Sequence, residues 1–319
     1  MLSISSPNVF SIVLFVISGF SLPVHIFGGY CILFKTPSYM KSVIWSLFNL
    51  HFWAGALDLS LNLFVQPFLC SLGYAGYLLG ILNFTPVPTD AQILAIRAVF
   101  MLVPVSIIFM FENRYFVLFG QNSFWKYLRY PFLILNFFIG LITFVPTFLT
   151  VPQDHENARR QLFNLYPNAC EYVPDKSLIF VINFYEKGWV KLAGNLTTYV
   201  LFVEIIVFVV ALKVKLNRIS KASMSSVTLR MQKKFIKALN LQISIPVLIF
   251  FAPSIAGLVP GGEQKTENQM KNNLLIIFTS FHGAISTILM IYLQEPYRQF
   301  FLARFVCHKD VSMNSVTMF

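Results

Sequence analysis

Long apolar runs alternate with short polar segments along the whole of this chain. A helix that spans a bilayer needs about 20 mostly apolar residues, and the runs approach or exceed that length. They predict spanning helices over about 9–34, 43–69, 91–111, 130–149, 195–212, 238–259 and 273–293, with a tail over about 294–319. We therefore expect an all-α membrane protein, in which one seven-helix bundle takes up the whole chain, 1–319.

Lys and Arg residues gather on one side of this predicted bundle. The odd-numbered loops and the tail carry most of them, whereas the N-terminal segment and the second-to-third loop carry none. The long fourth-to-fifth loop balances its basic residues with acidic ones. Because positively charged loops stay in the cytoplasm, the pattern predicts an N-terminus outside the cell and a tail inside it, as an odd number of helices requires.

Composition supports a membrane protein and excludes several other classes. The chain is 56% hydrophobic and only 12% charged, against roughly a quarter charged in soluble domains. The net charge of +11 would suggest a nucleic-acid partner in a soluble protein, but here the basic residues lie in loops, so we expect none. The sequence has no CxxC pair, nucleotide-binding glycine loop or GxSxG motif. We therefore expect no enzyme, cofactor or metal site.

A carboxylate in the middle of the second helix is the sharpest single feature of the sequence. Burying Asp58 there costs at least about 2.5–3.5 kcal/mol, so it must face the bundle interior with a partner. His51 and Asn62 fall on the same helical face. We interpret the three residues as part of an activation switch, a polar core that rearranges. The alternative is a static, hydrogen-bonded packing site.

The third helix ends in the sequence Glu112-Asn113-Arg114-Tyr115 at the predicted cytoplasmic face. Glu112 and Arg114 are two positions apart and so project from different faces of the helix. We therefore expect Arg114 to reach towards the fifth and sixth helices and to change partners on activation, with Glu112 in the same switch. The alternative is a stop-transfer boundary at which Arg114 extends its charge to water.

The fifth-to-sixth loop, 213–237, carries many basic residues and no acidic one. In a seven-helix protein such a loop suits contact with a G protein, and Lys233, Lys234 and Lys237 are the candidate contacts. Orientation in the membrane, together with attraction to anionic lipids, explains the same charges equally well.

Three further ionisable residues, Arg97, Glu204 and His282, lie within predicted helices. Ionisable side chains inside a membrane face the bundle interior or a cavity, so these three are candidates for a ligand pocket that opens outward. Hydrogen bonding between helices is the alternative, and it is the more common use of such residues.

Several residues are candidates for covalent modification. Cys70 and Cys170 both fall on the predicted outer side, where a disulfide could tie down the long loop. Asn83 and Asn195 begin glycosylation sequons near membrane boundaries. Cys307 follows the last helix in an aromatic and basic segment, and is a candidate for palmitoylation.

Short motifs are spread over nearly the whole chain. They are HIFGGYCILFKTP from His25, NLHFW from Asn49 with Asp58 after it, AGYLLG from Ala75, Glu112-Asn113-Arg114, Ile245-Pro246, His282-Gly283 and Pro296-Tyr297-Arg298. Together these motifs resemble the nematode serpentine chemoreceptors of class H, in the Str superfamily of seven-transmembrane receptors. The block from the first to the second helix is the most specific part of the resemblance.

The resemblance implies a multi-pass receptor in the plasma membrane, in sensory-neuron cilia, that detects a small-molecule or peptide cue and signals through a heterotrimeric G protein. This family resembles the rhodopsin-like receptors only distantly. The third helix here lacks their outer cysteine, and Glu112-Asn113-Arg114 stands in place of Asp-Arg-Tyr. Pro296, Tyr297 and Arg298 stand near the place of NPxxY, and so join the candidate activation switch.

A channel or transporter without G-protein coupling is the main alternative. It would need pore-lining acids or helices broken at the midplane, and Pro246 and Pro253 could break one helix. Seven-helix channels of the insect odorant-receptor type place the N-terminus inside, against the charge pattern here. A third class is a non-signalling structural or trafficking protein.

Overall fold

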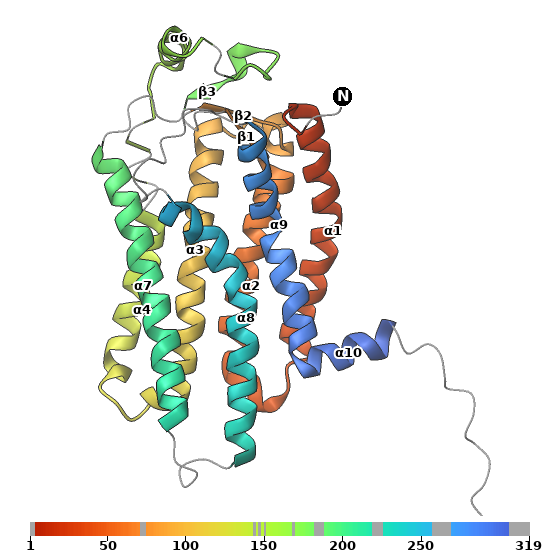
Figure 1. Ribbon diagram of the computed structural model, residues 1–319, viewed down its shortest axis with the longest axis vertical. Coiled ribbons are helices and arrows are strands. Elements are labelled where there is room, and N and C mark those ends of the chain that lie inside the picture. The colour runs from red at the N-terminus through yellow and green to blue at the C-terminus, as the bar shows by residue number, and fades with distance from the viewer. Residues whose placement is uncertain are drawn as a thin grey trace, which may run out of the picture.

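The computed structural model describes residues 4–70, 75–142, 145, 148–149, 151–167, 170–181, 188–218, 226–256 and 269–305. Within these segments a bundle of long helices runs along the longest axis of the molecule (Figure 1). The bundle helices are α1 (Pro7–Phe34), α2 (Ile44–Leu59), α3 (Thr89–Tyr115), α4 (Trp125–Ile142), α7 (Gly188–Arg218), α8 (Ser226–Ala256) and α9 (Gln269–Leu293). Each apolar run that predicts a spanning segment therefore overlaps one of these helices.

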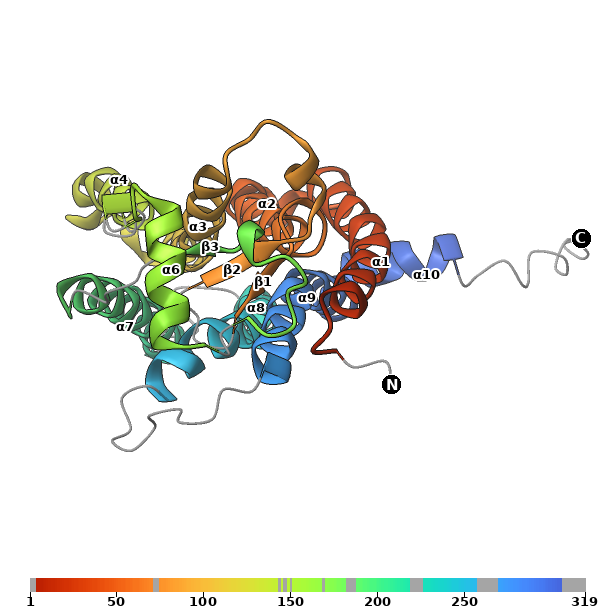
Figure 2. The ribbon, with the colours of Figure 1, turned by 90° about the horizontal axis from the view of Figure 1, so that it is seen from above.

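The order of the helices around the bundle is clear in the view from above (Figure 2). Helix α1 packs against α2 and α9, and α2 also packs against α9. Helix α3 contacts α2, α4 and α7, while α8 lies between α7 and α9. Among the described helices, α1, α9 and α3 with the turn that follows it are by themselves long and apolar enough to cross a membrane.

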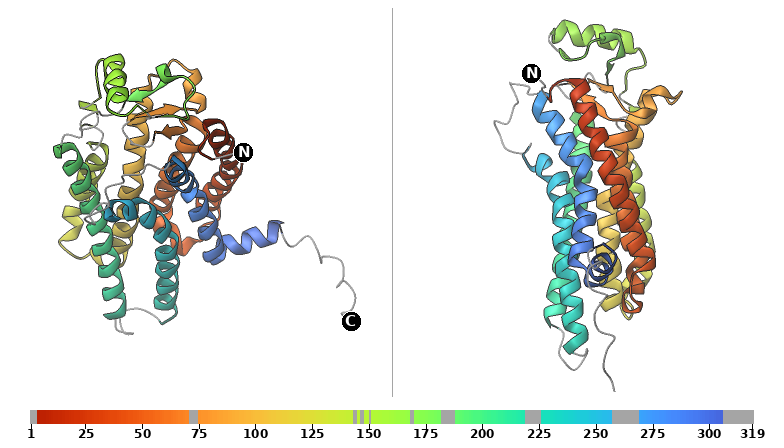
Figure 3. Two further views of the ribbon diagram at one scale, coloured as in Figure 1. Left: turned by 45° about the horizontal axis from the view of Figure 1, so that its top comes forward. Right: turned by 90° about the vertical axis from the view of Figure 1, so that its right-hand side faces the viewer.

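Within the described segments, two shorter α-helices lie outside the bundle. Helix α6 (His155–Leu165) sits beyond the end at which the N-terminus lies, and α10 (Glu295–Phe305) leaves the opposite end at a steep angle to the bundle (Figure 3). The side chain of Phe300 in α10 stacks on Phe27 of α1, with ring centroids 6.1 Å apart. Lys35 Nζ stands 4.5 Å from the centroid of the same Phe300 ring.

A small antiparallel sheet covers the end of the bundle nearest the N-terminus (Figure 1; Figure 3). Strand β1 (Pro67–Leu69) pairs with β2 (Ala75–Leu78), and β2 pairs with β3 (Phe180–Val181), in the order β1-β2-β3. Apolar side chains from the sheet and α6 form a second core there, separate from the core of the bundle. The sheet is thus an addition to the all-α bundle.

The second helix is shorter than its apolar run predicts. The prediction of a helix over 43–69 is wrong at its outer end, because α2 stops at Leu59 and a π-helical turn, Ser60–Phe64, leads into β1. Gln66 has a φ of 46°, in the left-handed region, and Pro67 lacks a backbone N–H to continue a helix. Hydropathy alone cannot distinguish a buried strand from a buried helix in so short an apolar segment.

The fifth and sixth bundle helices are longer than predicted. The expected loop 213–237 is largely helical, because α7 continues to Arg218 and α8 already begins at Ser226. Hydropathy detects only the apolar part of a helix, whereas Lys, Arg, Gln and Met are good helix formers that extend it into water. The candidate basic residues therefore stand on rigid helical ends.

Candidate functional site

Asp58 on α2 is fully buried where α1, α2 and α9 meet, and both of its oxygens accept hydrogen bonds. His25 Nε2 on α1 lies 3.1 Å from Oδ2, and His282 Nδ1 on α9 lies 2.8 Å from Oδ1. The backbone amide of Gly283 donates to Oδ1 at 3.1 Å, and that of Ala284 donates to Oδ2 at 2.8 Å. One carboxylate thus binds three helices together through two imidazoles and two amides.

Two backbone carbonyls of α9, opposite the amides that bind Asp58, also have hydrogen-bond partners. In a regular α-helix the amides of Gly283 and Ala284 point at the carbonyls of Thr279 and Ser280. Both carbonyls have side-chain partners here: His282 Nδ1 is 2.7 Å from the Thr279 oxygen, and Asn62 Nδ2 donates to the Ser280 oxygen at 3.1 Å. Asp58 and Asn62, one turn apart on α2, therefore contact successive peptide groups of α9.

Two glycines allow the helices to approach this closely. A Cβ added to Gly283 would stand 2.9 Å from both Ala54 O and Asp58 Oδ2. A Cβ added to Gly28 on α1 would stand 2.3 Å from Thr287 Cγ2 on α9. Real Cβ atoms do not come so near to other heavy atoms, so only glycine fits at these contacts.

His51, the third predicted member of the polar face, lies beside this cluster. Its Nε2 is 2.9 Å from the carbonyl oxygen of His25, and its Nδ1 is 3.3 Å from Thr287 Oγ1. The predicted face of α2 is thus the one that meets α1 and α9. The sequence did not lead us to predict His25 as a partner of this face. An imidazole in the middle of an apolar run is nevertheless a signal for a partner inside the bundle.

A cavity of about 400 Å³ lies beneath the sheet, between α3 and α9. Its walls come from α3, α9 and the strands β1 and β2, and they are mostly apolar. Of the three candidate ligand residues, Arg97 lines this cavity. His282 is held at Asp58, whereas Glu204 on α7 contacts Asn136 of α4. Thr279, which shares the predicted pocket face of α9 with His282, also lines it.

Glu112 and Arg114, at the opposite end of α3, have separate partners. Glu112 is fully buried and accepts from Trp125 Nε1 at 2.9 Å and from Arg129 Nε at 3.1 Å, both on α4. Arg114 is only 2% exposed, and its guanidinium carbon lies 3.9 Å from the ring centroid of Phe235 on α8. The acid and the base of this motif therefore turn to different neighbouring helices.

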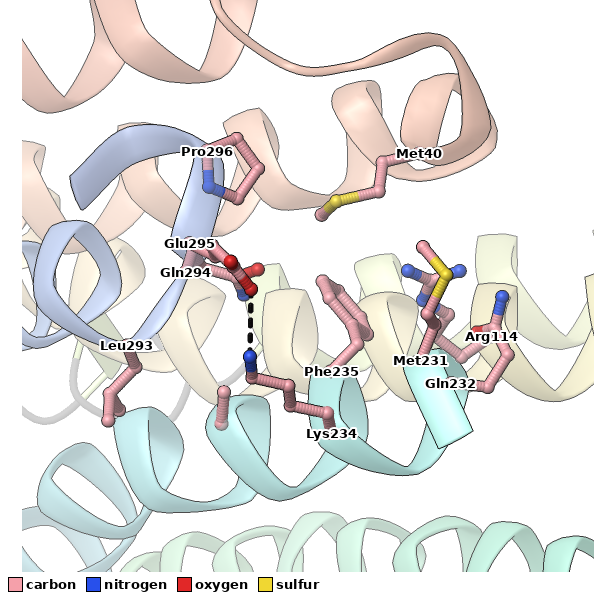
Figure 4. A pocket seen from close by; sticks show the side chains of 11 residues that line it. Met40, Arg114, Met231, Gln232, Lys234, Phe235, Leu293, Gln294, Glu295 and Pro296 are labelled. Atoms are coloured by element: carbon pink, nitrogen blue, oxygen red, sulfur yellow. Dashed lines mark hydrogen bonds and ion pairs between the residues drawn. The ribbon is translucent and has the colours of Figure 1, made fainter. Parts of the chain in front are cut away.

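A hollow beside Arg114 opens at this end of the bundle (Figure 4). The residues that line it are Met40, Arg114, Met231, Gln232, Lys234, Phe235, Ala238, Leu293, Gln294, Glu295 and Pro296. Lys234 Nζ donates to Glu295 Oε2 at 2.8 Å across the hollow, from α8 to the start of α10. This hydrogen bond holds the pKa of the Glu295 carboxyl below its ordinary value.

The other candidate residues of the inner end lie on α8 and α10. Tyr297 is fully buried, and its hydroxyl is 2.6 Å from Thr36 Oγ1 after α1. Arg298 is half-buried and donates to the Tyr292 carbonyl at 3.3 Å. Lys233 and Lys237 are exposed on α8. The candidate residues Pro296, Tyr297 and Arg298 thus form the first turn of α10, where it joins α9.

The candidate modification sites differ in their setting. Cys70 and Cys170 form a disulfide that joins the end of β1 to the segment after α6. Asn83 is exposed, whereas Asn195 is half-buried within α7. Cys307, the candidate for palmitoylation, lies outside the described residues.

Comparison with known proteins identifies the family. The profile of the family described as "Serpentine type 7TM GPCR chemoreceptor Srh" matches residues 5–307. The chain belongs to this family. A relative in Caenorhabditis elegans, "Serpentine receptor class H-72", is 26% identical to this serpentine receptor over 315 residues, which cover 95% of this chain and 88% of the relative. The serpentine receptor is therefore a multi-pass membrane protein of a chemoreceptor family, and not an enzyme.

Proposed function

We propose that this serpentine receptor binds an external small-molecule cue in the cavity beneath the sheet and signals to a heterotrimeric G protein at the other end. The observation that carries the proposal is a set of contacts that leads from the cavity to the buried cluster around Asp58. Thr279 lines the cavity, its carbonyl contacts His282, and His282 contacts Asp58. A ligand that moves α9 at Thr279 would therefore disturb the junction of α1, α2 and α9.

Several features support an N-terminus outside the cell. The N-terminus, the sheet and the disulfide lie at one end of the bundle, and the exposed lysines of α8 lie towards the other. Disulfides persist in oxidising, extracellular surroundings, and basic residues favour the cytoplasmic side. With this orientation the cavity of about 400 Å³ lies on the sensory side.

The inner end suits a signalling partner. Arg114 is buried against Phe235 of α8, at a hollow whose far wall is the start of α10. Separation of α8 from α10 would widen the hollow and free Arg114 for a new partner, as an activation switch requires. Lys233, Lys234 and Lys237 stand beside the hollow as contacts for an acidic surface of the G protein. In an animal this activity would belong in the plasma membrane of sensory cilia.

The test is ligand-dependent nucleotide exchange. The purified receptor in lipid nanodiscs is mixed with a panel of heterotrimeric G proteins, and binding of a non-hydrolysable GTP analogue is followed as small molecules are added. At least one molecule should accelerate exchange, and Arg114→Ala should abolish the acceleration while ligand binding remains. Ion flux through the same receptor in sealed vesicles, without any exchange, would favour a channel instead.

A further inference from the structure

Residues 81–88, which we call the pre-α3 segment, present apolar side chains to the outside of the molecule. Ile81 and Val87 are exposed, and Phe84 between them is 87% exposed. A patch of exposed apolar side chains marks a site of contact with another protein or with a membrane. The position of the segment, its lack of charge and its hydrogen bonds distinguish between these two partners.

The pre-α3 segment lies beside the bundle and not beyond its end. It projects sideways in the view from above, and in the right-hand view of Figure 3 it lies lower than the start of α1 (Figure 2; Figure 3). Helix α1 is long and apolar enough to cross a membrane, so a bilayer that surrounds α1 reaches the level of this segment. The π-helical turn Ser60–Phe64 contacts the segment and ends in the exposed Phe64. The apolar patch therefore continues onto the side of the bundle.

The segment also carries no charge, unlike α6 at the same end of the molecule. No Asp, Glu, Lys or Arg occurs between Asp58 and Asp90. Helix α6, which sits beyond the end of the bundle, instead carries the exposed ion pair of Glu156 and Arg160. Charged side chains are usual in water and costly in contact with lipid. The contrast indicates that α6 faces water whereas the pre-α3 segment faces lipid.

Several backbone groups of the segment are suited to lipid, which offers no partner for an N–H group. The amides of Asn83 and Thr85 donate to the carbonyls of Gly80 and Leu82, at 3.1 Å in each case. The two prolines of the segment have no backbone N–H at all. These residues therefore place no unpaired N–H in lipid.

The side chain of Gln92 holds the segment in place. It is buried in the first turn of α3, and its Nε2 donates to the carbonyls of Leu82 at 3.3 Å and Val87 at 2.9 Å. Gly80 fixes the other end, because a Cβ there would stand only 2.3 Å from the carbonyl oxygen of Phe64. The apolar side chains thus extend from a held backbone, so little conformational freedom is lost when they contact a partner.

We propose that the pre-α3 segment is an interfacial anchor, which inserts Phe84 into the lipid leaflet around the N-terminal end of the bundle, with Ile81 and Val87 beside it. Removal of these side chains from water stabilises the inserted state in proportion to their apolar area. Phe and other apolar side chains are the ones that amphipathic segments bury at the boundary of headgroups and acyl chains. The inference does not depend on the proposed function.

The depth of the segment is measured with a nitroxide label at position 84, on the full-length receptor in phosphatidylcholine nanodiscs. Cys31→Ser and Cys307→Ser remove other thiols, and Phe84→Cys supplies the labelled one. Relaxation of the label by oxygen, which concentrates in lipid, is compared with relaxation by a water-soluble nickel chelate. Oxygen should relax this label as strongly as one at Phe52→Cys, and the chelate should relax it several-fold less than one at Leu165→Cys.

The two reference positions are matched to Phe84 in exposure. Phe52 is exposed on the side of α2, whereas Leu165 is exposed on α6, beyond the end of the bundle. Access of the chelate to position 84 equal to that at Leu165 overturns the inference. Dipolar coupling between labels on two copies of the receptor, with neither agent reaching them, shows that a second copy covers the patch and overturns it as well.

Glycosylation of the unaltered receptor provides an independent check. Asn83 begins a sequon and directly precedes Phe84, and a glycan is bulky and solubilising. It therefore cannot be carried beside an inserted Phe84, so receptor made in animal cells should have no glycan at Asn83. Asn83→Gln should leave the electrophoretic mobility unchanged. A glycan found at Asn83 places the segment in water and overturns the inference.

Discussion

At the scale of single residues, Asp58 joins α1, α2 and α9 because each of its two oxygens contacts one imidazole and one backbone amide. Oδ1 faces His282 and the Gly283 amide, and Oδ2 faces His25 and the Ala284 amide. An imidazole can exchange its donor and acceptor nitrogens, but a backbone amide can only donate. Asp58 is therefore adapted to a place where four donors converge.

Replacing Asp58 by Asn tests this arrangement. Whichever way the new amide turns, its NH₂ group faces a backbone N–H of Gly283 or Ala284, and one buried donor loses its acceptor. The expected loss of folding free energy is about 1–3 kcal/mol, seen as a lower unfolding temperature of the purified receptor. The variant should reach the cell surface and show an altered ligand response. Unchanged signalling at matched surface levels would leave Asp58 as a packing residue.

Gly283→Ala tests the close approach of α9 to α2. The new Cβ would meet Ala54 O and Asp58 Oδ2 at 2.9 Å, so the helices must separate and the unfolding temperature should fall. Gly19→Ala in α1 is the control, because nothing lies within 4 Å of that position and alanine favours a helix by about 0.5–1 kcal/mol over glycine. Equal effects of the two substitutions would contradict the described packing.

The sequence predicted Asp58 as a buried, partnered group, but it did not predict its partners. A helical face shows which residues of α2 point inward, whereas the choice of neighbour depends on the packing of three helices. His25 on α1 was therefore missed as a contact of Asp58. Arg114 was expected to reach towards the fifth and sixth helices, and it lies on Phe235 of α8, the sixth of them. Its change of partner on activation stays a prediction.

At the scale of helices, the ends were harder to predict than the apolar middles. Hydropathy indicates where lipid surrounds a helix, but it does not indicate how far the helix continues into water. The basic segment 213–237 was read as a loop for this reason, although Lys234 stands on α8 and reaches α10. The sheet was missed because β1 belongs to the same apolar run as α2.

The hydrogen bond between Lys234 of α8 and Glu295 of α10 is expected to keep the hollow beside Arg114 narrow. Glu295→Gln weakens its bond with Lys234 without removing a basic residue, so it should raise basal nucleotide exchange by the G protein. Lys234→Ala should raise basal exchange less, since it also removes a candidate G-protein contact. Lys233→Ala, at an exposed neighbouring position, is the control for charge alone. Lower basal exchange in Glu295→Gln would exclude a closing role.

The same contact should depend on pH in a defined direction. The pKa of Glu295 is lowered by the hydrogen bond from Lys234, so the contact persists at neutral pH and is lost as the pH falls through that lowered value. Spin labels on α8 and α10 should report a longer distance only at acidic pH. Glu295→Gln should remove this dependence, and a change centred near neutral pH would point to another group.

At the scale of the whole molecule, the two ends of the bundle differ in construction. The end nearest the N-terminus is closed by a sheet, α6 and a disulfide, whereas the other end carries exposed lysines and the aromatic contact of α10 with α1. The charge pattern in the sequence predicts which end faces the cytoplasm, and this orientation stays a prediction.

An epitope tag tests this orientation. A tag before Met1 should be stained by antibody on intact cells that express the receptor. A tag after Phe319 should be stained only after the membrane is permeabilised, which makes it the internal control. Staining of the N-terminal tag only after permeabilisation would invert the topology and place the cavity beneath the sheet on the cytoplasmic side.

The bond between Cys70 and Cys170 has a consequence for how the receptor is made. The two cysteines are 100 residues apart, with α3, α4 and α6 between them. A ribosome adds about 5–20 residues per second, so Cys70 would stay a free thiol for about 5 to 20 seconds before its partner is synthesised. In the orientation proposed here it spends that interval in the lumen of the endoplasmic reticulum, beside β1 and β2 that still lack β3. During that interval Cys70 is therefore open to pairing with another thiol, before Cys170 enters the lumen.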